Sequence, residues 1–184
     1  MNYRAIYFLA FFLVLAGFLW KGLYLNPNYV PSELIHNKVP GFNVATVENV
    51  NNSISDDIFK GRISILNVWN TSCPACISEH KTFALISQFI QQDANSSNLQ
   101  LIGFNLNDQL EDANFWLQNQ GNPYKLSLFD QRGKLSFDFG ISGTPETFLI
   151  DQNKVIRLRH QGPINSEIWE HVFKTEINKI QRET

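Results

Sequence analysis

Two cysteines and a single methionine are the only sulfur-containing residues among the 184 of this chain. A structural zinc site needs four ligands, and His80 and His160, which could join the cysteines, form no second ligand pair. Covalent haem attachment needs a histidine directly after the second cysteine, where this chain has Ile77. We therefore expect neither a metal nor a bound cofactor.

The chain also lacks an excess of charge of either sign. Its formal net charge is −2, and no run of lysine or arginine is present. Nucleic-acid-binding domains carry a basic patch or stripe, so we expect no nucleic-acid partner. Hydrophobic residues make up 43% of the chain and include 15 phenylalanines, enough for a sizeable core. The length allows one domain with an appendage.

Both cysteines lie in the segment Cys73-Pro74-Ala75-Cys76, between an apolar run at 63–69 that predicts a strand and a helical pattern. Residues three apart on a helix lie on one face, so the two sulfurs can meet. The free N–H groups and dipole of the helix start favour a thiolate at Cys73, the expected nucleophile, and Cys76 would resolve the mixed disulfide. A structural disulfide is the alternative, but its two-residue loop removes little chain entropy. The pattern indicates a thioredoxin-like redox site.

The helix after Cys73 has one apolar face with spacings of three and four residues, formed by Cys76, Glu79, Phe83, Ile86 and Ile90. This spacing places Glu79 inward, one turn from Cys76. Its carboxylate either reaches solvent at the edge of the face, or is partly desolvated with a raised pKa and can relay the proton of Cys76. We expect the neighbouring His80 to be exposed or to cap a helix rather than to catalyse.

Further strands are predicted at 42–47, 54–59, 99–105, 126–129 and 155–159, and helices at 108–120 and 164–180. Another apolar strand follows the segment Gly143-Thr144-Pro145-Glu146. A proline at this point predicts a cis peptide bond that exposes the backbone of Thr144 beside the cysteines, where an extended substrate could pair with it. An ordinary trans proline at a strand start is the alternative.

The N-terminus carries the longest apolar run, sixteen uncharged residues from Ala5 to Trp20. Trp20, Lys21 and Tyr24 suit a membrane boundary. We expect residues 1–25 to form a transmembrane anchor rather than a cleaved signal peptide, because no small-x-small cleavage site is evident.

A linker at 26–38, which contains Pro27 and Pro31, should connect this anchor to a folded domain at 39–184. The short segment before the apolar run favours a cytoplasmic N-terminus, with the cysteine domain on the other side of the membrane.

Taken together, these motifs resemble the DsbE (CcmG) family, membrane-anchored thiol:disulfide interchange proteins of cytochrome c maturation. The matching segments are Leu66-Asn67-Val68-Trp69, Cys73-Pro74-Ala75-Cys76 with Glu79-His80, Gly121-Asn122-Pro123-Tyr124-Lys125-Leu126-Ser127-Leu128-Phe129-Asp130, Pro145-Glu146-Thr147-Phe148-Leu149-Ile150-Asp151 and Arg157-Leu158-Arg159-His160. They cover most of residues 39–173.

The resemblance implies an α/β thioredoxin-like fold, a central mixed sheet flanked by helices, with an N-terminal β-hairpin and a central insert after one transmembrane helix. It implies a periplasmic thiol:disulfide oxidoreductase tethered to the inner membrane. This enzyme would keep the haem-binding cysteines of apocytochrome c, or a haem-lyase-associated thiol protein, reduced. A DsbD-type membrane electron donor would reduce it again.

The resemblance also assigns residues. Cys73 and Cys76 form the redox-active disulfide, Pro145 is the cis proline, and Glu79 and Glu146 are acidic residues near the site.

Trp69 and Thr144, together with Pro145, are the expected substrate contacts. Two positions differ from related proteins. Asn67 stands where thioredoxin has a buried aspartate, so the proton relay is assigned to Glu79. Ser72 stands where the family has an aromatic residue directly before the first cysteine.

Two other functions stay open. The chain could be a general anchored thioredoxin-like disulfide reductase or a thiol peroxidase, although a peroxidase needs an isolated peroxidatic cysteine. It could also be a non-enzymatic binding module that keeps the fold and uses its groove.

Overall fold

The computed structural model describes residues 3–23, 34–92 and 98–183, which fall into two units, Met1–Val30 and Pro31–Thr184. The first unit contains helix α1 (Tyr3–Leu23). Within the described ranges, no helix is both long enough and apolar enough to cross a membrane. Tyr24 and residues 26–33 of the predicted linker, including both of its prolines, lie outside the described residues.

The second unit begins with a segment that lies along its sheet. The N–H of His36 donates to the Ile156 carbonyl and the N–H of Val39 to the Lys154 carbonyl, each over 2.8 Å. These backbone bonds tie residues 36–39 to the domain. The described end of the predicted linker, from Leu34 to residue 38, is therefore part of the folded domain.

Five strands form the central sheet in the order β5-β4-β3-β6-β7. The strands are β3 (Ile63–Trp69), β4 (Leu99–Leu106), β5 (Ser127–Asp130), β6 (Glu146–Ile150) and β7 (Ile156–Gln161). β3, β4 and β5 are parallel, whereas β6 is antiparallel to both of its neighbours. Every residue of β3 and β4 is buried, which explains why their sequences are mainly apolar rather than alternating.

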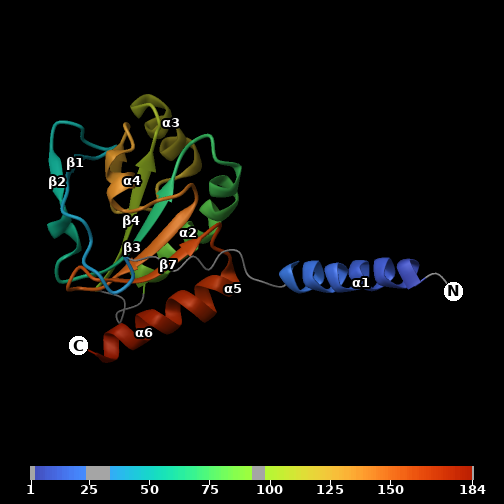
Figure 1. Cartoon of the computed structure of the whole chain (residues 1–184). Coiled ribbons are helices and arrows are strands. Elements are labelled where there is room, and N and C mark those ends of the chain that lie inside the picture. The colour runs from blue at the N-terminus through green and yellow to red at the C-terminus, as the bar shows by residue number, and fades with distance from the viewer. Residues whose placement is uncertain (1–2, 24–33, 93–97, 184) are drawn as a thin grey trace. The chain divides into compact units, whose positions relative to one another are not determined.

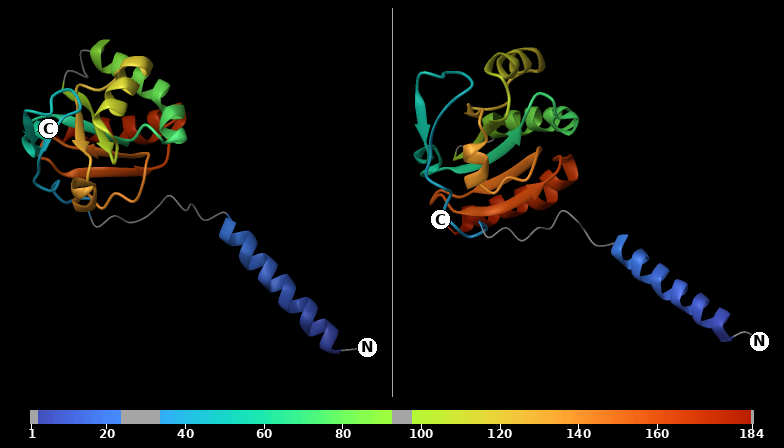
Figure 2. Two further views of the ribbon diagram at one scale, coloured as in Figure 1. Left: turned by 90° about the horizontal axis from the view of Figure 1, so that it is seen from above. Right: turned by 45° about the horizontal axis from the view of Figure 1, so that its top comes forward.

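Helices cover both faces of this sheet (Figures 1 and 2). One face packs against α2 (Pro74–Gln92), α3 (Leu110–Gln120) and the C-terminal helix. That helix consists of α5 (Ser166–Ile168), a π-helical turn η3 (Trp169–Phe173) and α6 (Lys174–Arg182). The other face packs against α4 (Lys134–Asp138) and the 3₁₀ helix η1 (Asp56–Phe59).

The domain also carries the expected hairpin, β1 (Asn43–Ala45) paired antiparallel with β2 (Ser53–Ser55). A bridge between Thr46 and Leu128 attaches it to β5 at the sheet edge. The second strand is shorter than predicted because the Ser55 side chain accepts the N–H of Asp57 and starts η1 there. α3 and β5 stand between β4 and α4.

Gly103 allows the three parallel strands to close around a large side chain. A Cβ at this position of β4 would lie 2.3 Å from Oγ of Ser127 and 2.9 Å from Nε1 of Trp69. A larger residue would push β5 or the Trp69 indole out of place. Because Trp69 is the last residue of β3, Gly103 helps to set where that strand ends and the cysteine loop begins.

Candidate active site

The two cysteines lie where β3 ends and α2 begins, and they form a disulfide. The Cys73 carbonyl accepts the N–H of Ile77 over 3.2 Å and so opens the helix. The N–H of Cys76 points at Sγ of Cys73 over 3.0 Å. This donor and the helix dipole favour a thiolate at Cys73 once the disulfide is reduced. Cys73 is 7% exposed and Cys76 2%. The geometry supports Cys73 as the nucleophile.

Asp108 holds the loop that leads into the cysteines, and the sequence had not identified it as a site residue. Its carboxylate accepts the N–H of Thr71 and the hydroxyl of Thr71, each over 2.8 Å, and Nδ2 of Asn105 over 2.7 Å. The parallel strands β3 and β4 end at the same edge of the sheet, so Thr71 and Asp108 meet there. The strand order could have indicated this contact from the sequence, because Thr71 closely follows β3 and Asp108 closely follows β4.

Glu79 is buried one helical turn from Cys76, with only 2% of its surface exposed. Oε1 accepts from Nδ2 of Asn67 over 2.9 Å and Oε2 from the N–H of Ile164 over 2.8 Å. Burial raises its pKa from 4.5 to about 7, although both hydrogen bonds oppose this shift. Of the two alternatives for this residue, the structure therefore supports the desolvated carboxylate, which can accept a proton near neutral pH.

Asn67 connects Glu79 to two further side chains in the core. Its Oδ1 accepts the hydroxyl of Tyr124 over 2.7 Å, and its Nδ2 also donates to Oγ1 of Thr147 over 3.2 Å. Burial, with the nearby Glu79 charge as a smaller cause, raises the pKa of Tyr124 well above its ordinary value, so the phenol stays neutral. The sequence had marked Asn67 as a departure from thioredoxin, but it had not linked Tyr124 to the site.

His80 is buried and caps the end of α3. Its Nε2 lies 3.1 Å from the Gln120 carbonyl and 3.0 Å from that of Gly121, and its ring meets Trp116 edge-on at 4.4 Å between centroids. Burial lowers its pKa. Of the two expected roles, exposure is wrong and capping is correct.

Trp69 does not contact substrate, which corrects a sequence-based prediction. It is only 1% exposed, and its ring stacks on Trp116 at 4.8 Å and on Tyr124 at 6.0 Å between centroids. The indole belongs to the core because β3 is the middle strand of the sheet and α3 covers its end.

The loop before β6 carries the proposed substrate contacts. The peptide bond between Thr144 and Pro145 is cis, in agreement with the expectation. Among the described residues, neither the N–H nor the carbonyl of Thr144 has a hydrogen-bond partner, whereas the Pro145 carbonyl accepts the N–H of Gly162 over 2.9 Å. The loop lines an open hollow of about 250 Å³. This backbone is free to pair with an extended segment.

Glu146 follows Pro145 in the chain but faces the other side of the sheet. Successive residues of a strand point to opposite faces, and Thr147 contacts Asn67 on the α2 side. The buried Glu146 carboxylate forms an ion pair with Arg159 and accepts the N–H of Ser142 over 3.2 Å. Burial raises its pKa, and the Arg159 contact opposes this.

Glu146, which the resemblance placed near the site, therefore adds no uncompensated negative charge on the side of the thiols. The Arg159 guanidinium compensates its charge, and Nη2 of Arg159 also donates to the Gly140 carbonyl over 2.8 Å. Together, Arg159 and Glu146 bind the backbone of the loop at Gly140 and Ser142, just before the cis proline. Their contribution to the site is the shape of the cis-proline loop.

Ser72 is exposed directly before Cys73, and its hydroxyl donates to Oδ1 of Asn70 over 3.2 Å. This small polar side chain leaves Cys73 without an aromatic neighbour directly before it in the chain.

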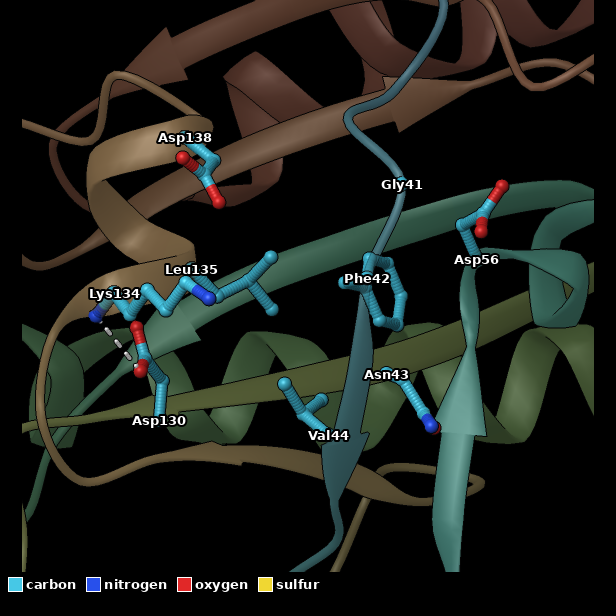
Figure 3. A pocket seen from close by; sticks show the side chains of 9 residues that line it. All are labelled: Gly41, Phe42, Asn43, Val44, Asp56, Asp130, Lys134, Leu135 and Asp138. Atoms are coloured by element: carbon cyan, nitrogen blue, oxygen red, sulfur yellow. Dashed lines mark hydrogen bonds between the residues drawn. The ribbon is translucent and has the colours of Figure 1, made fainter.

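A larger cavity, of about 530 Å³, lies between β1 and α4 and contains no part of the redox site (Figure 3). Two of its three acids have partners: Asp130 accepts the N–H groups of Lys134 and Ser136, and Asp56 pairs with Lys154. Within the described ranges, no group of three or more potential ligands could hold a metal ion.

A disulfide at a strand-to-helix junction, facing a cis-proline loop on a mixed sheet, defines a thiol:disulfide oxidoreductase of thioredoxin fold. The Redoxin family matches residues 35–177. A thiol:disulfide interchange protein DsbE from Vibrio cholerae is 38% identical over 189 residues, covering 100% of this chain and 98% of its own. The DsbE from Allochromatium vinosum is 35% identical over 97% of this chain and 94% of its own. The chain belongs to the DsbE family of thiol:disulfide interchange proteins.

A solved structure supports the fold independently. A candidate DsbE from Chlorobium tepidum superimposes with a TM-score of 0.66 at 20% identity, over 80% of this chain and 97% of that one.

Glu79→Gln is expected to change how stability depends on pH. Between pH 4.5 and about 7 the folded protein keeps a proton on Glu79 that the unfolded chain releases. This contribution is complete below pH 4.5 and is lost as pH rises to 7, by up to about 3 kcal/mol. Glu79→Gln removes this dependence. Urea unfolding of the oxidised protein from pH 5 to 8 measures it without cysteine titration.

Glu111→Gln, at an exposed position of α3, is the control and should follow the unmodified protein. Equal pH slopes for Glu79→Gln and the unmodified protein would contradict the raised pKa.

Arg159→Gln is expected to loosen the cis-proline loop. It leaves the buried Glu146 carboxylate without its counter-charge, which costs about 3 kcal/mol of unfolding free energy. Because the loop then orders substrate less well, KM for a disulfide-bonded peptide should rise more than kcat falls. Arg157→Gln on the same strand, which removes ion pairs with Asp151, Glu176 and Glu183, is the control. An unchanged KM for Arg159→Gln would rule out the loop role.

Proposed function

We propose that this protein is a periplasmic reductant of cytochrome c maturation, which keeps the haem-binding cysteines of apocytochrome c, or a partner thiol protein, reduced. The observation that carries this proposal is the buried carboxylate of Glu79, one helical turn from Cys76 on α2. A negative charge in the core disfavours a thiolate nearby. A less stabilised thiolate makes the disulfide relatively more stable, and the dithiol becomes more reducing. Such a pair can donate electrons in an oxidising compartment.

The reaction begins at Cys73. Its thiolate attacks one sulfur of the substrate disulfide, the substrate S–S bond breaks, and a mixed disulfide with Cys73 forms. The sulfur that leaves takes a proton from solvent.

Cys76 completes the exchange with the help of Glu79. Its thiol gives its proton to the Glu79 carboxylate, and the resulting thiolate attacks Sγ of Cys73. The bond between Cys73 and Cys76 forms as the bond to substrate breaks, and the second substrate sulfur leaves and is protonated. The substrate disulfide gains two electrons, and the protein dithiol is oxidised. A DsbD-type membrane donor then returns two electrons to the protein.

Substrate recognition rests on the backbone beside the cysteines. The unpaired N–H and carbonyl of Thr144 suit an extended peptide, which would lie in the hollow lined by the 142–146 loop and Gly162. Backbone pairing places few demands on side chains. A polypeptide segment that contains the haem-binding cysteines of a cytochrome could pair with Thr144 in this way. A segment of a partner thiol protein could do so as well.

We also infer that residues 1–25 anchor the chain in the inner membrane, with the cysteine domain in the periplasm. The proposal rests on the sixteen uncharged residues from Ala5 to Trp20.

A general disulfide reductase is the main competing function, because the same site chemistry would serve it. A peroxidase is disfavoured because Cys73 is already paired with Cys76, one turn into the helix. A binding module without redox activity would not use the carboxylate of Glu79.

Deletion of the gene is expected to abolish c-type cytochromes in the host cell, and a small thiol added to the medium should restore them. Cys73→Ser should behave like the deletion. Cys76→Ser should accumulate mixed disulfides through Cys73, visible on non-reducing gels, because the resolving thiol is missing. Lys81→Ala, at an exposed position of α2, is the control. Normal cytochromes in the deletion strain, together with trapped partners of other kinds, would favour the general reductase.

The membrane proposal has its own test. A reporter enzyme that is active only in the periplasm should work when fused to the C-terminus, and the full chain should stay in the membrane fraction after alkaline carbonate extraction. A variant in which a cleavable signal replaces residues 1–25 should be released in soluble form. Activity of a reporter that works only in the cytoplasm would contradict the proposed orientation.

A further inference from the structure

A line of buried hydrogen bonds runs from the segment after α3 to helix α2, where Glu79 lies one turn from Cys76. The Tyr124 hydroxyl donates to Oδ1 of Asn67 over 2.7 Å, and Nδ2 of Asn67 donates to Oε1 of Glu79 over 2.9 Å. The exposed fractions of the three residues are 7%, 0% and 2%. Because these groups are removed from solvent, a partner lost from this line is not easily replaced by water.

The amide of Asn67 has a donor end and an acceptor end, and its partners decide which end faces Glu79. A phenol donates a hydrogen bond better than it accepts one, because its oxygen lone pair is delocalised into the ring. Tyr124 therefore favours the orientation in which Oδ1 faces the phenol and Nδ2 faces the carboxylate. The aliphatic hydroxyl of Thr147, 3.2 Å from Nδ2, donates and accepts equally well and selects neither orientation.

The Tyr124 ring is held in place by its neighbours, so its hydroxyl has a fixed direction. Its centroid lies 6.0 Å from that of Trp69, with the planes 13° apart, and 6.4 Å from that of Phe83. The backbone is fixed as well, since the N–H of Tyr124 donates to Oδ1 of Asn122 over 3.0 Å. The hydroxyl therefore arrives at Asn67 pre-organised.

We propose that Tyr124 is a positioning residue of the exchange reaction, whose hydroxyl holds the Asn67 amide with its donor end toward Glu79. The bond from Tyr124 also polarises the amide and strengthens the bond that Nδ2 gives to the carboxylate. The ionised form of Glu79, which receives the Cys76 proton, is thereby favoured. This inference rests on the proposed role of Glu79 as proton acceptor.

Other groups around Glu79 do not duplicate this effect. Ile164 supplies a backbone N–H to the other carboxylate oxygen. The Nε2 of His80 is directed at the carbonyls that end α3. His160 lies opposite Thr147 on β7 and is hydrogen-bonded to the backbone of Pro163. In the part of the chain that the structure describes, only Tyr124 donates to the acceptor end of Asn67. Within the described residues, the titratable and polar groups on the elements around Glu79 include Cys76 and His80 of α2, Asn67 of β3, Thr147 of β6, His160 of β7, Tyr124, and the N–H of Ile164.

The test compares the full chain with Tyr124→Phe, which keeps the ring and removes the hydroxyl. Both proteins are reduced and solubilised in detergent. Their glutamate carboxyl carbons are isotopically labelled, and NMR follows the titration of Glu79. We expect the midpoint of Glu79 in Tyr124→Phe to move to higher pH by about one unit, a roughly tenfold smaller carboxylate fraction at a given pH below both midpoints. The rate at which Cys76 resolves the mixed disulfide should rise with pH. The midpoint of that rise should move to higher pH by the same amount as the Glu79 midpoint.

Ser64→Ala is the matched control. Ser64 is also fully buried on β3, and its hydroxyl accepts from Nε2 of Gln100 over 2.8 Å, outside the line to Glu79. This variant should lose stability and keep the midpoint. An unchanged midpoint in Tyr124→Phe, or an equal shift in Ser64→Ala, would overturn the proposal. If Tyr124→Phe does not fold, the same titration of Asn67→Ser decides, because that variant lacks the donor to Oε1 and should show at least the same shift.

A second pair of variants separates this inference from the proposed function. Glu79→Gln should abolish the pH dependence of the resolution rate, and Tyr124→Phe added to it should then have no effect on that profile. If Glu79→Gln keeps the dependence, the proton-acceptor role of Glu79 fails. If Glu79→Gln abolishes the pH dependence while Tyr124→Phe leaves its midpoint unchanged, only the role assigned to Tyr124 fails.

Discussion

The burial of one carboxylic acid in the core, Glu79, is the constraint on which the rest of the site depends. A charge in an apolar core is unfavourable unless hydrogen bonds stabilise it, so the surrounding elements have to supply donors. β3 supplies Asn67, and the segment before α5 supplies the N–H of Ile164. These bonds stop short of full compensation, and the pKa of about 7 that results suits a proton acceptor at neutral pH.

The sheet separates two acidic residues that the sequence had grouped together. Glu79 lies on the face covered by α2, with the cysteines, whereas Glu146 lies on the opposite face and is paired with Arg159. One carboxylate is therefore available to exchange protons with the thiols, and the other fixes the loop that presents Thr144. Both are buried, but their partners differ: Glu79 has neutral donors, and Glu146 has a guanidinium. The same residue type thus serves two different purposes in one domain.

The active-site edge of the sheet owes its geometry to parallel strands. Because β3 and β4 end side by side, the loop with Thr71 and the carboxylate of Asp108 meet directly in front of α2. Because β3 is the central strand, Trp69 at its end is enclosed by neighbouring elements. Cys73, four residues later, lies beyond the end of the strand, where α2 begins. These relations give the cysteine loop a rigid base, which precise alignment of two sulfurs and a proton acceptor requires.

Local patterns in the sequence determined a large part of this protein. Continuous apolar runs fixed β3 and β4, the spacing from Cys76 to Ile86 fixed the inward position of Glu79, and the motifs around Pro145 indicated the family. Each of these depends on contacts within one element or on recognisable residue order. The tertiary structure alone decided that Trp69 is a core residue, that Glu146 turns away from the thiols, and that Tyr124 and Asp108 reach the site. Those outcomes depend on which strands become neighbours and which face each side chain takes, and only the packed sheet brings such distant residues within hydrogen-bond range.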